Sequence, residues 1–330
     1  MDFLEGFGMC DRPKILIVSR SFGVYCSEAI EILKGFSLVE RRRVSTKDEL
    51  KNVVKGYDGL VLGNEKLDRE VLLEADKLKI VARHGVGVDN IDLDAATEKG
   101  VVVTYTPGAN SDSVAEYAVA LMLNLMRRIN KAHEETSKGG WRRFLGFELT
   151  GKTVGIVGFG RIGRKVARKL SGFDVKILVY DPYVDREDVE RQGAKPVGLE
   201  DLLRASDVVT LHVKLTGETK HLINGERLKL MRRGAFLINT SRGAVVDEEA
   251  LYEALKDGKL GGAALDVFEQ EPVNPDNPLL TLDNVIVSPH MANFTVEALR
   301  RMDMMNARDL ELFFKGERPI NVANPEVLER

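Results

Sequence analysis

The stretch VGIVGFGRIG (154–163) places a run of apolar, largely β-branched residues directly before a glycine-rich turn and a helical pattern. Gly158, Gly160 and Gly163 suit a tight turn, a close backbone approach to a ligand and close packing of the helix on the strand. A glycine-rich turn alone is weak evidence. This turn, however, lies in the strand–turn–helix context that phosphate binding needs, so we expect an anion site here.

The residues around this turn predict which anion it binds. The N–H groups of Arg161 and Ile162 stand at the start of the helix, where the helix dipole favours a pyrophosphate. Asp181 ends the next expected strand, and a carboxylate there binds the ribose hydroxyls of NAD and repels the additional phosphate of NADP. Asp181 could instead merely open a turn before Pro182. We favour the first interpretation and expect a dinucleotide site that prefers NAD.

Strand and helix patterns alternate along most of the chain, which is typical of parallel α/β layers. The pattern breaks at 106–108, and a long helix is expected at 111–129 with a capping box of Ser113 and Glu116. Two α/β domains account for the pattern, and a final helix at 296–314 could return to the first of them. Strands are expected within 14–19, 59–63, 79–90, 101–105, 152–163, 176–181, 207–213, 235–240, 263–268 and 284–290.

Composition and charge exclude several function classes. The chain has 330 residues, 44% of them apolar and 30% charged, and a net charge of -3, which indicates a soluble globular protein without a basic surface for nucleic acid or membrane. The apolar run 118–126 is too short to span a bilayer. The acidic N-terminal stretch predicts no secretory signal. Cys10 and Cys26 lack metal-ligand spacing and fit a reducing cytoplasm, so no metal is expected.

Three polar residues stand at or just beyond the carboxyl ends of expected strands, where ligands bind in open parallel sheets: Arg242, Glu271 and His290. Arg242 can hold a carboxylate and polarise a carbonyl. His290 can protonate the carbonyl oxygen while NADH gives a hydride to its carbon. Glu271 would orient the imidazole and favour its protonated form. Each residue alone has an ordinary structural interpretation, but together they predict hydride transfer to a 2-oxo acid, with Asp247 capping the helix after Arg242.

Other residues are assigned to binding by their position. The turn HGVGVDN (84–90) lacks the helix of a phosphate loop, but it can present the N–H groups of Val86 and Gly87 to a small carboxylate. His84 either faces the ligand or packs, and His221 has no evident partner. Asp266 could accept a hydrogen bond from the nicotinamide amide. On the cofactor side we also place His212 and Thr240.

The chain resembles the D-isomer-specific 2-hydroxyacid dehydrogenases from about Lys14 to Asn324. The motifs that carry the resemblance are GVGVDNID, NSDSVAE, TVGIVGFGRIG, LINTSRGAVVDE, GAALDVFEQEP and the histidine of SPH. The resemblance implies that the catalytic trio falls on Arg242, Glu271 and His290. It also implies that NAD is the cofactor and that the reaction interconverts a 2-hydroxy acid and a 2-oxo acid.

The same resemblance implies an organisation into two Rossmann-like domains, each with a doubly wound parallel sheet. Residues 1–108 and 295–330 would form a discontinuous, flavodoxin-like substrate domain around an inserted NAD-binding domain, residues 109–294. Members of the family usually pair through their cofactor domains, and Trp141 could reach the neighbouring subunit. The two domains would close on the substrate by a hinge motion.

The substrate is less well defined by the resemblance. The sequence is most similar to phosphoglycerate dehydrogenases and to hydroxypyruvate or glyoxylate reductases. Arg83 matches an arginine that phosphoglycerate dehydrogenases use for the substrate phosphate, but the sequence Gly63-Asn64-Glu65 stands where a second such arginine is expected. No serine-sensing domain is expected after Asn324. Phosphoglycerate therefore stays one of several candidates.

Two related functions compete with the dehydrogenase. Corepressors of the same fold bind NADH and retain the trio, although this chain shows no long tail for partner docking. Formate dehydrogenases are similar but carry glutamine in place of the carboxylate, whereas Glu271 is present here. Lys214 stands where many relatives have proline, and the sequence predicts no effect for it.

Overall fold

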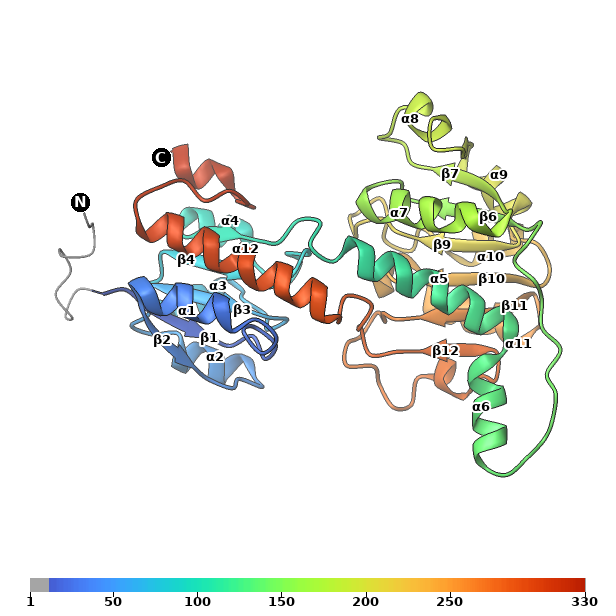
Figure 1. Cartoon of the computed structure of the whole chain (residues 1–330), viewed down its shortest axis with the longest axis horizontal. Helices are drawn as coiled ribbons and strands as arrows, with labels where there is room; N and C mark the ends of the chain where they lie inside the picture. Colours follow the sequence, from blue (N-terminus) through green and yellow to red (C-terminus); the bar gives the residue numbers. More distant parts are fainter. Residues whose placement is uncertain (1–11, 330) are drawn as a thin grey trace. The chain divides into compact units, whose positions relative to one another are not determined.

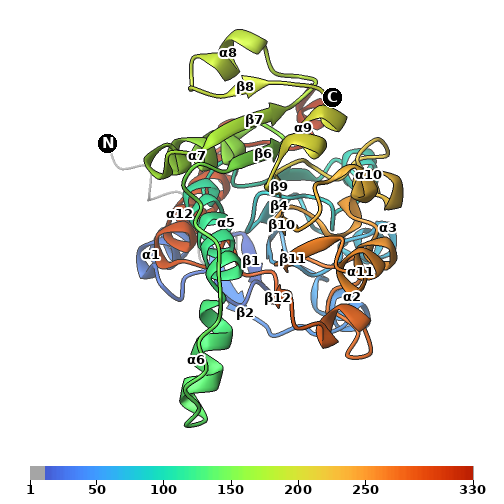
Figure 2. The ribbon, with the colours of Figure 1, turned by 90° about the vertical axis from the view of Figure 1, so that its right-hand side faces the viewer.

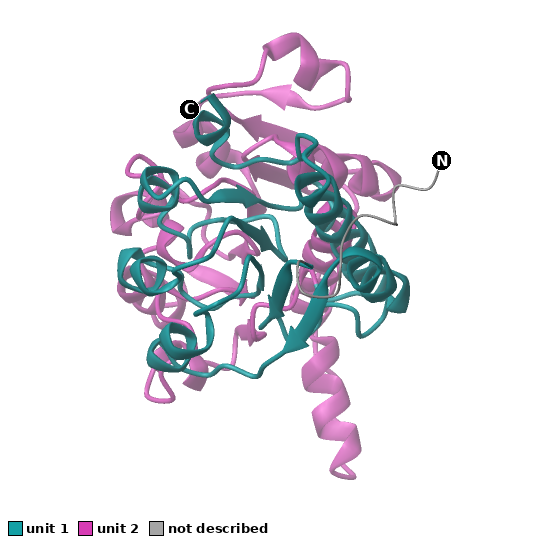
Figure 3. Cartoon of the chain, turned by 90° about the vertical axis from the view of Figure 1, so that its left-hand side faces the viewer, with its two compact units in different colours: residues 1–110, 294–330 teal, residues 111–293 magenta. Residues whose placement is uncertain are grey.

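The computed structural model describes residues 12–329 and divides into two compact units. Unit 1 comprises residues 1–110 and 294–330, and unit 2 comprises residues 111–293 (Figure 3). The breaks thus fall at 110 and 294, where the sequence predicts 108 and 295. The acidic N-terminal stretch and Cys10 lie outside the described residues, so the expectations for them stay predictions.

Unit 1 is built on a parallel sheet with helices on both faces. Its strands are β1 (Lys14–Ile17), β2 (Leu38–Arg41), β3 (Gly59–Leu62), β4 (Ile80–Arg83) and β5 (Val102–Thr104), and its helices are α1 (Ser27–Phe36), α2 (Lys47–Val53), α3 (Arg69–Glu74), α4 (Leu93–Glu98) and α12 (Val296–Phe314). The strand order is β2-β1-β3-β4-β5. Because side chains alternate across a strand, Ile15 and Ile17 pack on α1 and α12, whereas Leu16 packs on the other face with α2 and α3.

The last long helix returns to the first unit, as the sequence predicts. α12 lies beside α1 in Figure 1 and buries Ala307 and Leu310 against that face of the sheet. Thr295 caps its N-terminus by accepting a hydrogen bond from the backbone N–H of Ala298 at 3.2 Å. The cap fixes where the helix begins.

Unit 2 contains a second parallel sheet, of seven strands. These are β6 (Thr153–Val157), β7 (Lys176–Tyr180), β8 (Lys195–Pro196), β9 (Val208–Leu211), β10 (Ala235–Asn239), β11 (Leu260–Leu265) and β12 (Val285–Val287); the helices are α5 (Ser111–Arg127), α6 (Ile129–Ser137), α7 (Arg161–Leu170), α8 (Arg186–Glu190), α9 (Leu199–Ala205), α10 (Gly225–Leu230) and α11 (Glu248–Lys256). The strand order is β12-β11-β10-β9-β6-β7-β8. From β6 to β8 each new strand is added on one side of β6, and from β9 to β12 on the other, so the order changes direction between β6 and β9. Ligands of doubly wound sheets bind at such a switch point.

The fold class is confirmed: both units are α/β with parallel strands. Within unit 2, α5 and α7 cover one face of the sheet, and α9, α10 and α11 cover the other. α6 projects away from that sheet, as Figure 2 shows. None of the helices from residue 12 to residue 329 combines the length and the apolar character that a membrane crossing requires.

Two local predictions were wrong. α5 begins at Ser111, so Ser113 lies inside the helix and is not its N-cap. The helix expected to run to 129 ends at Arg127, because Arg128 adopts a left-handed conformation with φ 54° and separates α5 from α6. The edge strand β2 was missed because its sequence, LVER, is short and half polar.

Candidate active site

The glycine-rich turn between β6 and α7 has the shape that a dinucleotide requires. Gly158 has φ 92°, and a Cβ on it would lie 2.7 Å from the carbonyl carbon of His212. A Cβ on Gly163 would lie 2.1 Å from the carbonyl oxygen of Gly158. A Cβ on Gly160, in contrast, would meet no described atom within 4 Å. Two glycines therefore permit close packing, and the third leaves open space beside the turn, where we expect a pyrophosphate.

The start of α7 is free to receive an anion. Gly160 is the N-cap and has no side chain to cap the helix, and the first N–H groups of a helix have no partner within it. These groups include those of Arg161 and Ile162, and the first turn contains no acidic residue. The positive end of the helix dipole therefore faces the turn without a competing carboxylate.

Asp181 follows β7 and reaches the glycine-rich turn. Its carboxylate accepts hydrogen bonds from the backbone N–H of Phe159 at 2.7 Å and of Tyr183 at 2.9 Å. The hydrogen bond from Tyr183 closes the turn at Pro182. The hydrogen bond from Phe159 holds the Asp181 carboxylate beside the glycine-rich turn. Both interpretations of Asp181 are therefore compatible: it closes a turn and stands where a ribose is expected. Its contact with ribose stays a prediction.

Replacing Asp181 by alanine is expected to lower the preference for NADH over NADPH, measured as the ratio of kcat/KM, by about tenfold or more. The negative charge of Asp181 is expected to repel the 2′-phosphate of NADPH. Removing about 1.4 kcal/mol of this repulsion changes the ratio of kcat/KM by a factor of ten. Asp201→Ala, an exposed change on α9, is the control. An unchanged ratio in Asp181→Ala would argue against the ribose contact.

Two buried polar atoms near the switch point lack a partner among the described residues: Nδ1 of His212, after β9, and Oγ1 of Thr240, after β10. Buried polar groups are ordinarily hydrogen-bonded, so these atoms are suited to contact a bound cofactor. The other ring nitrogen of His212 lies 2.9 Å from Thr210 Oγ1. Burial lowers the pKa of His212 to about 3, so its ring is neutral at ordinary pH.

The turn that carries Arg242 is fixed from both sides. The Asn239 side chain, at the end of β10, accepts a hydrogen bond from the backbone N–H of Ser241 at 3.0 Å and donates one to the carbonyl oxygen of Arg242 at 2.9 Å. Downstream, Asp247 caps α11 by accepting from the N–H of Ala250 at 3.0 Å, as predicted. The half-buried Arg242 side chain is thus presented at the carboxyl edge of the sheet.

Glu271 and His290 form the hydrogen-bonded pair that the sequence predicts. Glu271 Oε2 lies 2.6 Å from His290 Nδ1, and Glu271 Oε1 accepts from the backbone N–H of Phe268 at 3.1 Å. Burial acts to raise the pKa of Glu271, but the hydrogen bond and charge of His290, the Phe268 N–H and the charge of Arg242 outweigh it and hold that pKa below its ordinary value. Glu271 is therefore an anion at neutral pH.

The turn that carries His290 is held by Asp266, a role that the sequence did not predict. His290 has φ 50°, and its N–H donates to the Asp266 carbonyl oxygen at 2.8 Å. The buried Asp266 carboxylate accepts from Ser288 Oγ at 2.6 Å and from the N–H groups of Met291 at 2.9 Å and Ala292 at 2.8 Å. Oδ2 accepts only the hydrogen bond from Ala292, so it can accept a further one. The predicted contact with a nicotinamide amide stays a prediction.

The turns of Arg242 and Glu271 touch through a glycine. A Cβ on Gly243 would lie 1.8 Å from the carbonyl carbon of Phe268 and 2.3 Å from the N atom of Glu269. The Glu269 carboxylate lies 3.1 Å from His221 Nε2. The backbone N–H of Glu269 donates to Glu248 Oε1 at 2.6 Å. His221 therefore has a partner after all, one that the sequence did not reveal because the two residues meet only in the fold.

Gly243→Ala is expected to lower the free energy of unfolding by about 1–3 kcal/mol, because the overlap involves backbone atoms that no side-chain rotation can relieve. It should also reduce kcat by separating the two catalytic turns. Thermal unfolding followed by circular dichroism measures the first effect. Gly217→Ala, where a Cβ would meet no described atom within 4 Å, is the matched control. Equal melting temperatures for the two variants would contradict the close approach.

In unit 1, the loop 84–90 follows β4. Among the described residues, no hydrogen bond involves the backbone N–H groups of Val86 or Gly87, and both residues are half-buried. They are free to bind a carboxylate, and that assignment stays a prediction. The assignment of Arg83 to substrate binding stays a prediction as well. Its side chain is 9% exposed and hydrogen-bonded within the unit.

His84 packs in the interior of unit 1. Its Nδ1 lies 2.9 Å from Ser19 Oγ and its Nε2 lies 2.9 Å from Asp303 Oδ1 on α12. The ring also makes an edge contact with Phe22, with centroids 5.5 Å apart. Of the two interpretations that the sequence left open, the structure supports packing.

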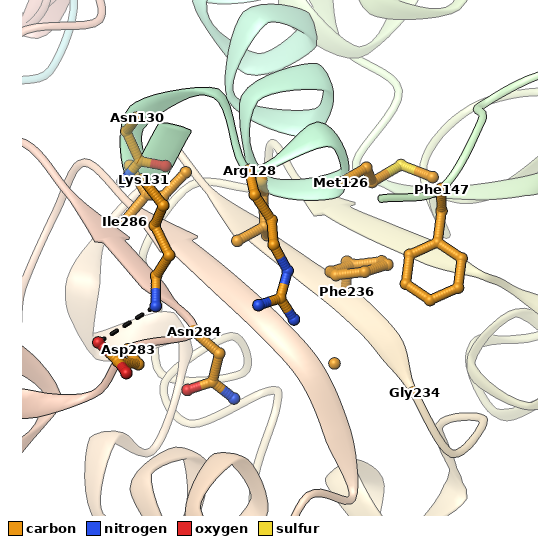
Figure 4. Close-up of a pocket in the computed structure, with 12 residues that line it drawn as sticks. Met126, Arg128, Asn130, Lys131, Phe147, Gly234, Phe236, Asp283, Asn284 and Ile286 are labelled. Atoms are coloured by element: carbon orange, nitrogen blue, oxygen red, sulfur yellow. Dashed lines mark ion pairs between the residues drawn. The ribbon is translucent and has the colours of Figure 1, made fainter. Parts of the chain in front are cut away.

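Figure 4 shows a separate cavity of about 210 Å³ in unit 2. It lies at the amino ends of β10 and β12, where Gly234 and Asn284 line it, and Lys131 forms an ion pair with Asp283 at 3.1 Å beside it. Arg242, Glu271 and His290 follow the carboxyl ends of β10, β11 and β12, so this cavity is not the candidate active site. Within residues 12–329, no cluster of three or more histidine, cysteine or acidic residues is arranged to hold a metal ion.

With this geometry in place, comparison with known proteins identifies the family. Residues 119–292 match the model of the D-isomer specific 2-hydroxyacid dehydrogenase, NAD binding domain. The chain belongs to this family. The match lies within unit 2, so unit 2 contains the NAD-binding domain of the family, and the glycine-rich turn and Asp181 are part of it.

The similarity to other family members extends over most of the chain. A glyoxylate reductase of Korarchaeum cryptofilum is 48% identical over 284 residues, which cover 84% of this chain and 85% of the relative. A D-3-phosphoglycerate dehydrogenase of Methanocaldococcus jannaschii is 46% identical over 301 residues, but these cover 90% of this chain and only 57% of the longer relative. The structure of D-lactate dehydrogenase from Aquifex aeolicus, complexed with NAD and lactic acid, is similar with a TM-score of 0.83 and 34% identity over 94% of this chain and 99% of that one.

Proposed function

We propose that the protein is an NAD-dependent D-2-hydroxyacid dehydrogenase that interconverts a small 2-oxo acid and its 2-hydroxy acid. The observation that carries the proposal is the Glu271–His290 pair, whose atoms lie 2.6 Å apart beyond the strands of the NAD-binding domain. Arg242 follows β10 of the same sheet. Family membership supports the reaction class, and the carboxyl edge of the sheet is where a doubly wound fold binds its ligands.

Each member of the trio has a distinct role in the proposed reaction. NADH, when bound, supplies the hydride to the carbonyl carbon of the substrate. Arg242 binds the substrate carboxylate with its fork of donors and polarises the neighbouring carbonyl group. Because Nδ1 of His290 faces Glu271, Nε2 is the nitrogen that gives a proton to the carbonyl oxygen. The Glu271 anion stabilises the imidazolium before the transfer and fixes the orientation of the ring.

The fit of the cofactor rests on three features of unit 2: the open space at Gly160, the uncapped start of α7 and the unpartnered buried atoms of His212 and Thr240. We place the ribose hydroxyls on Asp181 and the nicotinamide amide on Asp266. In unit 1, the N–H groups of Val86 and Gly87 are our candidates for contacts with the substrate carboxylate.

An NADH oxidation screen tests the proposed activity. Glyoxylate, hydroxypyruvate, 3-phosphohydroxypyruvate, pyruvate and larger 2-oxo acids would each be added to protein and NADH while absorbance is followed. Steady turnover with at least one of them is the expected result. NADH binding without turnover of any acid would instead favour an NADH-sensing binding protein of the same fold, which was the competing interpretation of the sequence.

We also propose that two copies pair through unit 2. Support comes from α6 and the segment after it, which carry large apolar side chains on the surface: Ile129 is 54% exposed, Trp141 86% and Leu145 88%. Exposed apolar groups gathered on one projecting segment are typical of protein interfaces. A molar mass near 73 kDa (about twice the 36.7 kDa of the chain) in multi-angle light scattering is expected, and a monomer at micromolar concentration would contradict the pairing. The expected cytoplasmic location stays a prediction.

A further inference from the structure

Arg83 ends β4 beside the loop 84–90, and its guanidinium folds back over that loop. Nε donates to the carbonyl oxygen of Gly87 at 3.0 Å and to Asn90 Oδ1 at 3.2 Å. Nη1 donates to the carbonyl oxygen of His84 at 2.6 Å. All of these acceptors belong to the loop, so one side chain connects both ends of it.

The same cluster ties the loop to the turn after β3. Arg83 Nη2 donates to Asn64 Oδ1 at 3.0 Å. Asn90 Nδ2 donates to the carbonyl oxygens of Gly63 at 3.2 Å and Glu65 at 2.7 Å. The guanidinium and one amide thus join two segments that are far apart in sequence. We call Arg83, Asn64 and Asn90 the loop brace.

The loop is shaped to fit the brace. A Cβ on Gly85 would lie 2.4 Å from Arg83 Nη1, so only glycine allows the guanidinium to lie this close. The carbonyl oxygen of Gly85 accepts a hydrogen bond from the N–H of Thr106 at 3.0 Å, which anchors the loop on its other side. Two anchors on either side of Val86 fix the direction in which the N–H groups of Val86 and Gly87 point.

We propose that Arg83 is a positioning residue that fixes the loop 84–90, and not a ligand for a substrate phosphate, so that the acceptor is an unphosphorylated 2-oxo acid. This proposal rests on the proposed dehydrogenase activity. An arginine that binds phosphate offers a fork of donors to it. In this chain each of the three guanidinium nitrogens donates to a protein acceptor, so the protein determines how the guanidinium is oriented. Turning it towards a ligand would remove donors from the carbonyl oxygens of His84 and Gly87 and free the loop.

The two roles predict different kinetics for substitutions of Arg83. Arg83→Met removes the donors and keeps an unbranched side chain. If Arg83 positions the loop, the KM for hydroxypyruvate and for 3-phosphohydroxypyruvate should rise by a similar factor, about tenfold or more, while kcat changes less. If it binds phosphate, only the phosphorylated acid should be affected. Arg83→Lys keeps the charge but not the fork. It should behave like Arg83→Met in the first case, whereas in the second case it should impair only the phosphorylated acid, and less severely than Arg83→Met does.

Asn90→Ala tests the effect of loop position alone, because it leaves the charge of Arg83 in place. It removes the two hydrogen bonds to the turn after β3 and the one that Arg83 Nε donates, without changing any charge. We expect it to raise both KM values together, as Arg83→Met does. Arg69→Met, which removes an exposed guanidinium paired with Glu98 in the same unit, is the matched control and should leave both values unchanged. NADH dissociation constants and melting temperatures of all variants show whether each is folded.

The experiment is steady-state reduction of the two acids by wild type and these variants. Wild type should have the higher kcat/KM for hydroxypyruvate, and the ratio between the acids should be the same in Arg83→Met and Asn90→Ala. A wild type that prefers the phosphorylated acid, together with an Arg83→Met that loses only this acid, would overturn the proposal and leave the dehydrogenase intact. If wild type reduces no 2-oxo acid at all, the proposed function itself fails. Should Arg83→Met not fold, the comparison of Arg83→Lys with Asn90→Ala decides between the roles.

Discussion

Arg242→Ala is expected to lower kcat/KM for the 2-oxo acid by about a thousandfold, with the dissociation constant of NADH unchanged. The guanidinium makes charge-assisted hydrogen bonds to the carboxylate and stabilises charge on the carbonyl oxygen, and loss of one such donor costs about 10²–10³ in rate. Loss of both interactions places the effect at the upper end of this range. Steady-state kinetics and fluorescence titration with NADH measure the two quantities.

Truncation at Arg242 leaves its local fold in place, because the turn is held by Asn239 and Asp247 through backbone contacts. Arg232→Ala is the control, since it removes an exposed guanidinium from the same unit that pairs with Asp207 at 2.9 Å. Activity of Arg242→Ala within tenfold of wild type would show that Arg242 does not hold the substrate.

His290→Ala is expected to lower kcat by about 10²–10⁴, the usual contribution of a general acid. In the proposed reaction His290 supplies the proton of the reduction, so the variant should lose turnover while the dissociation constant of NADH is unchanged. Steady-state kinetics and a titration with NADH measure the two quantities. A kcat of His290→Ala within tenfold of wild type would reject His290 as the acid.

Glu271 loses its charge in acid, and whatever depends on that charge is then lost. Its pKa lies below the ordinary value, so its charge is present at neutral pH and is lost only as pH falls through the lowered pKa. The support that Glu271 gives to the imidazolium and to folding is therefore complete at neutral pH and disappears in acid. Glu271→Gln removes the charge at every pH, so its melting temperature should lie below that of wild type at neutral pH, and the difference should shrink in acid.

The sequence was sufficient to predict the position of a residue wherever that residue follows the end of a strand. Arg242, Glu271 and His290 each follow a recognisable apolar strand, and parallel strands end at one edge of a sheet, so the proximity of Glu271 and His290 could be predicted. Asp247 could be assigned as a cap because a carboxylate before an acidic helix start has a local cause. α12 could be predicted as a helix from its sequence pattern, and its place in unit 1 was implied by the family resemblance.

Other features were beyond the sequence because their causes are not local. The brace at Arg83 depends on Asn64, which reaches it only through the pairing of β3 with β4. The partner of His221 is Glu269, 48 residues away. Arg128 ends α5 with a left-handed conformation that no glycine or proline announces. Asp266 was predicted as a cofactor ligand, and the three hydrogen bonds that its carboxylate accepts from the turn of His290 become visible only in the fold.

The predicted ribose contact of Asp181 would link the choice of cofactor to the integrity of the glycine-rich turn. The two hydrogen bonds that its carboxylate accepts, from the backbone N–H groups of Phe159 and Tyr183, fix the direction of the carboxylate. Any substitution that admits NADPH must also give up a tether of that turn, unless the new side chain accepts the same two bonds. Redesign for the other cofactor therefore faces a trade-off with thermal stability, and a side chain that retains one acceptor, as in Asp181→Asn, is the natural starting point.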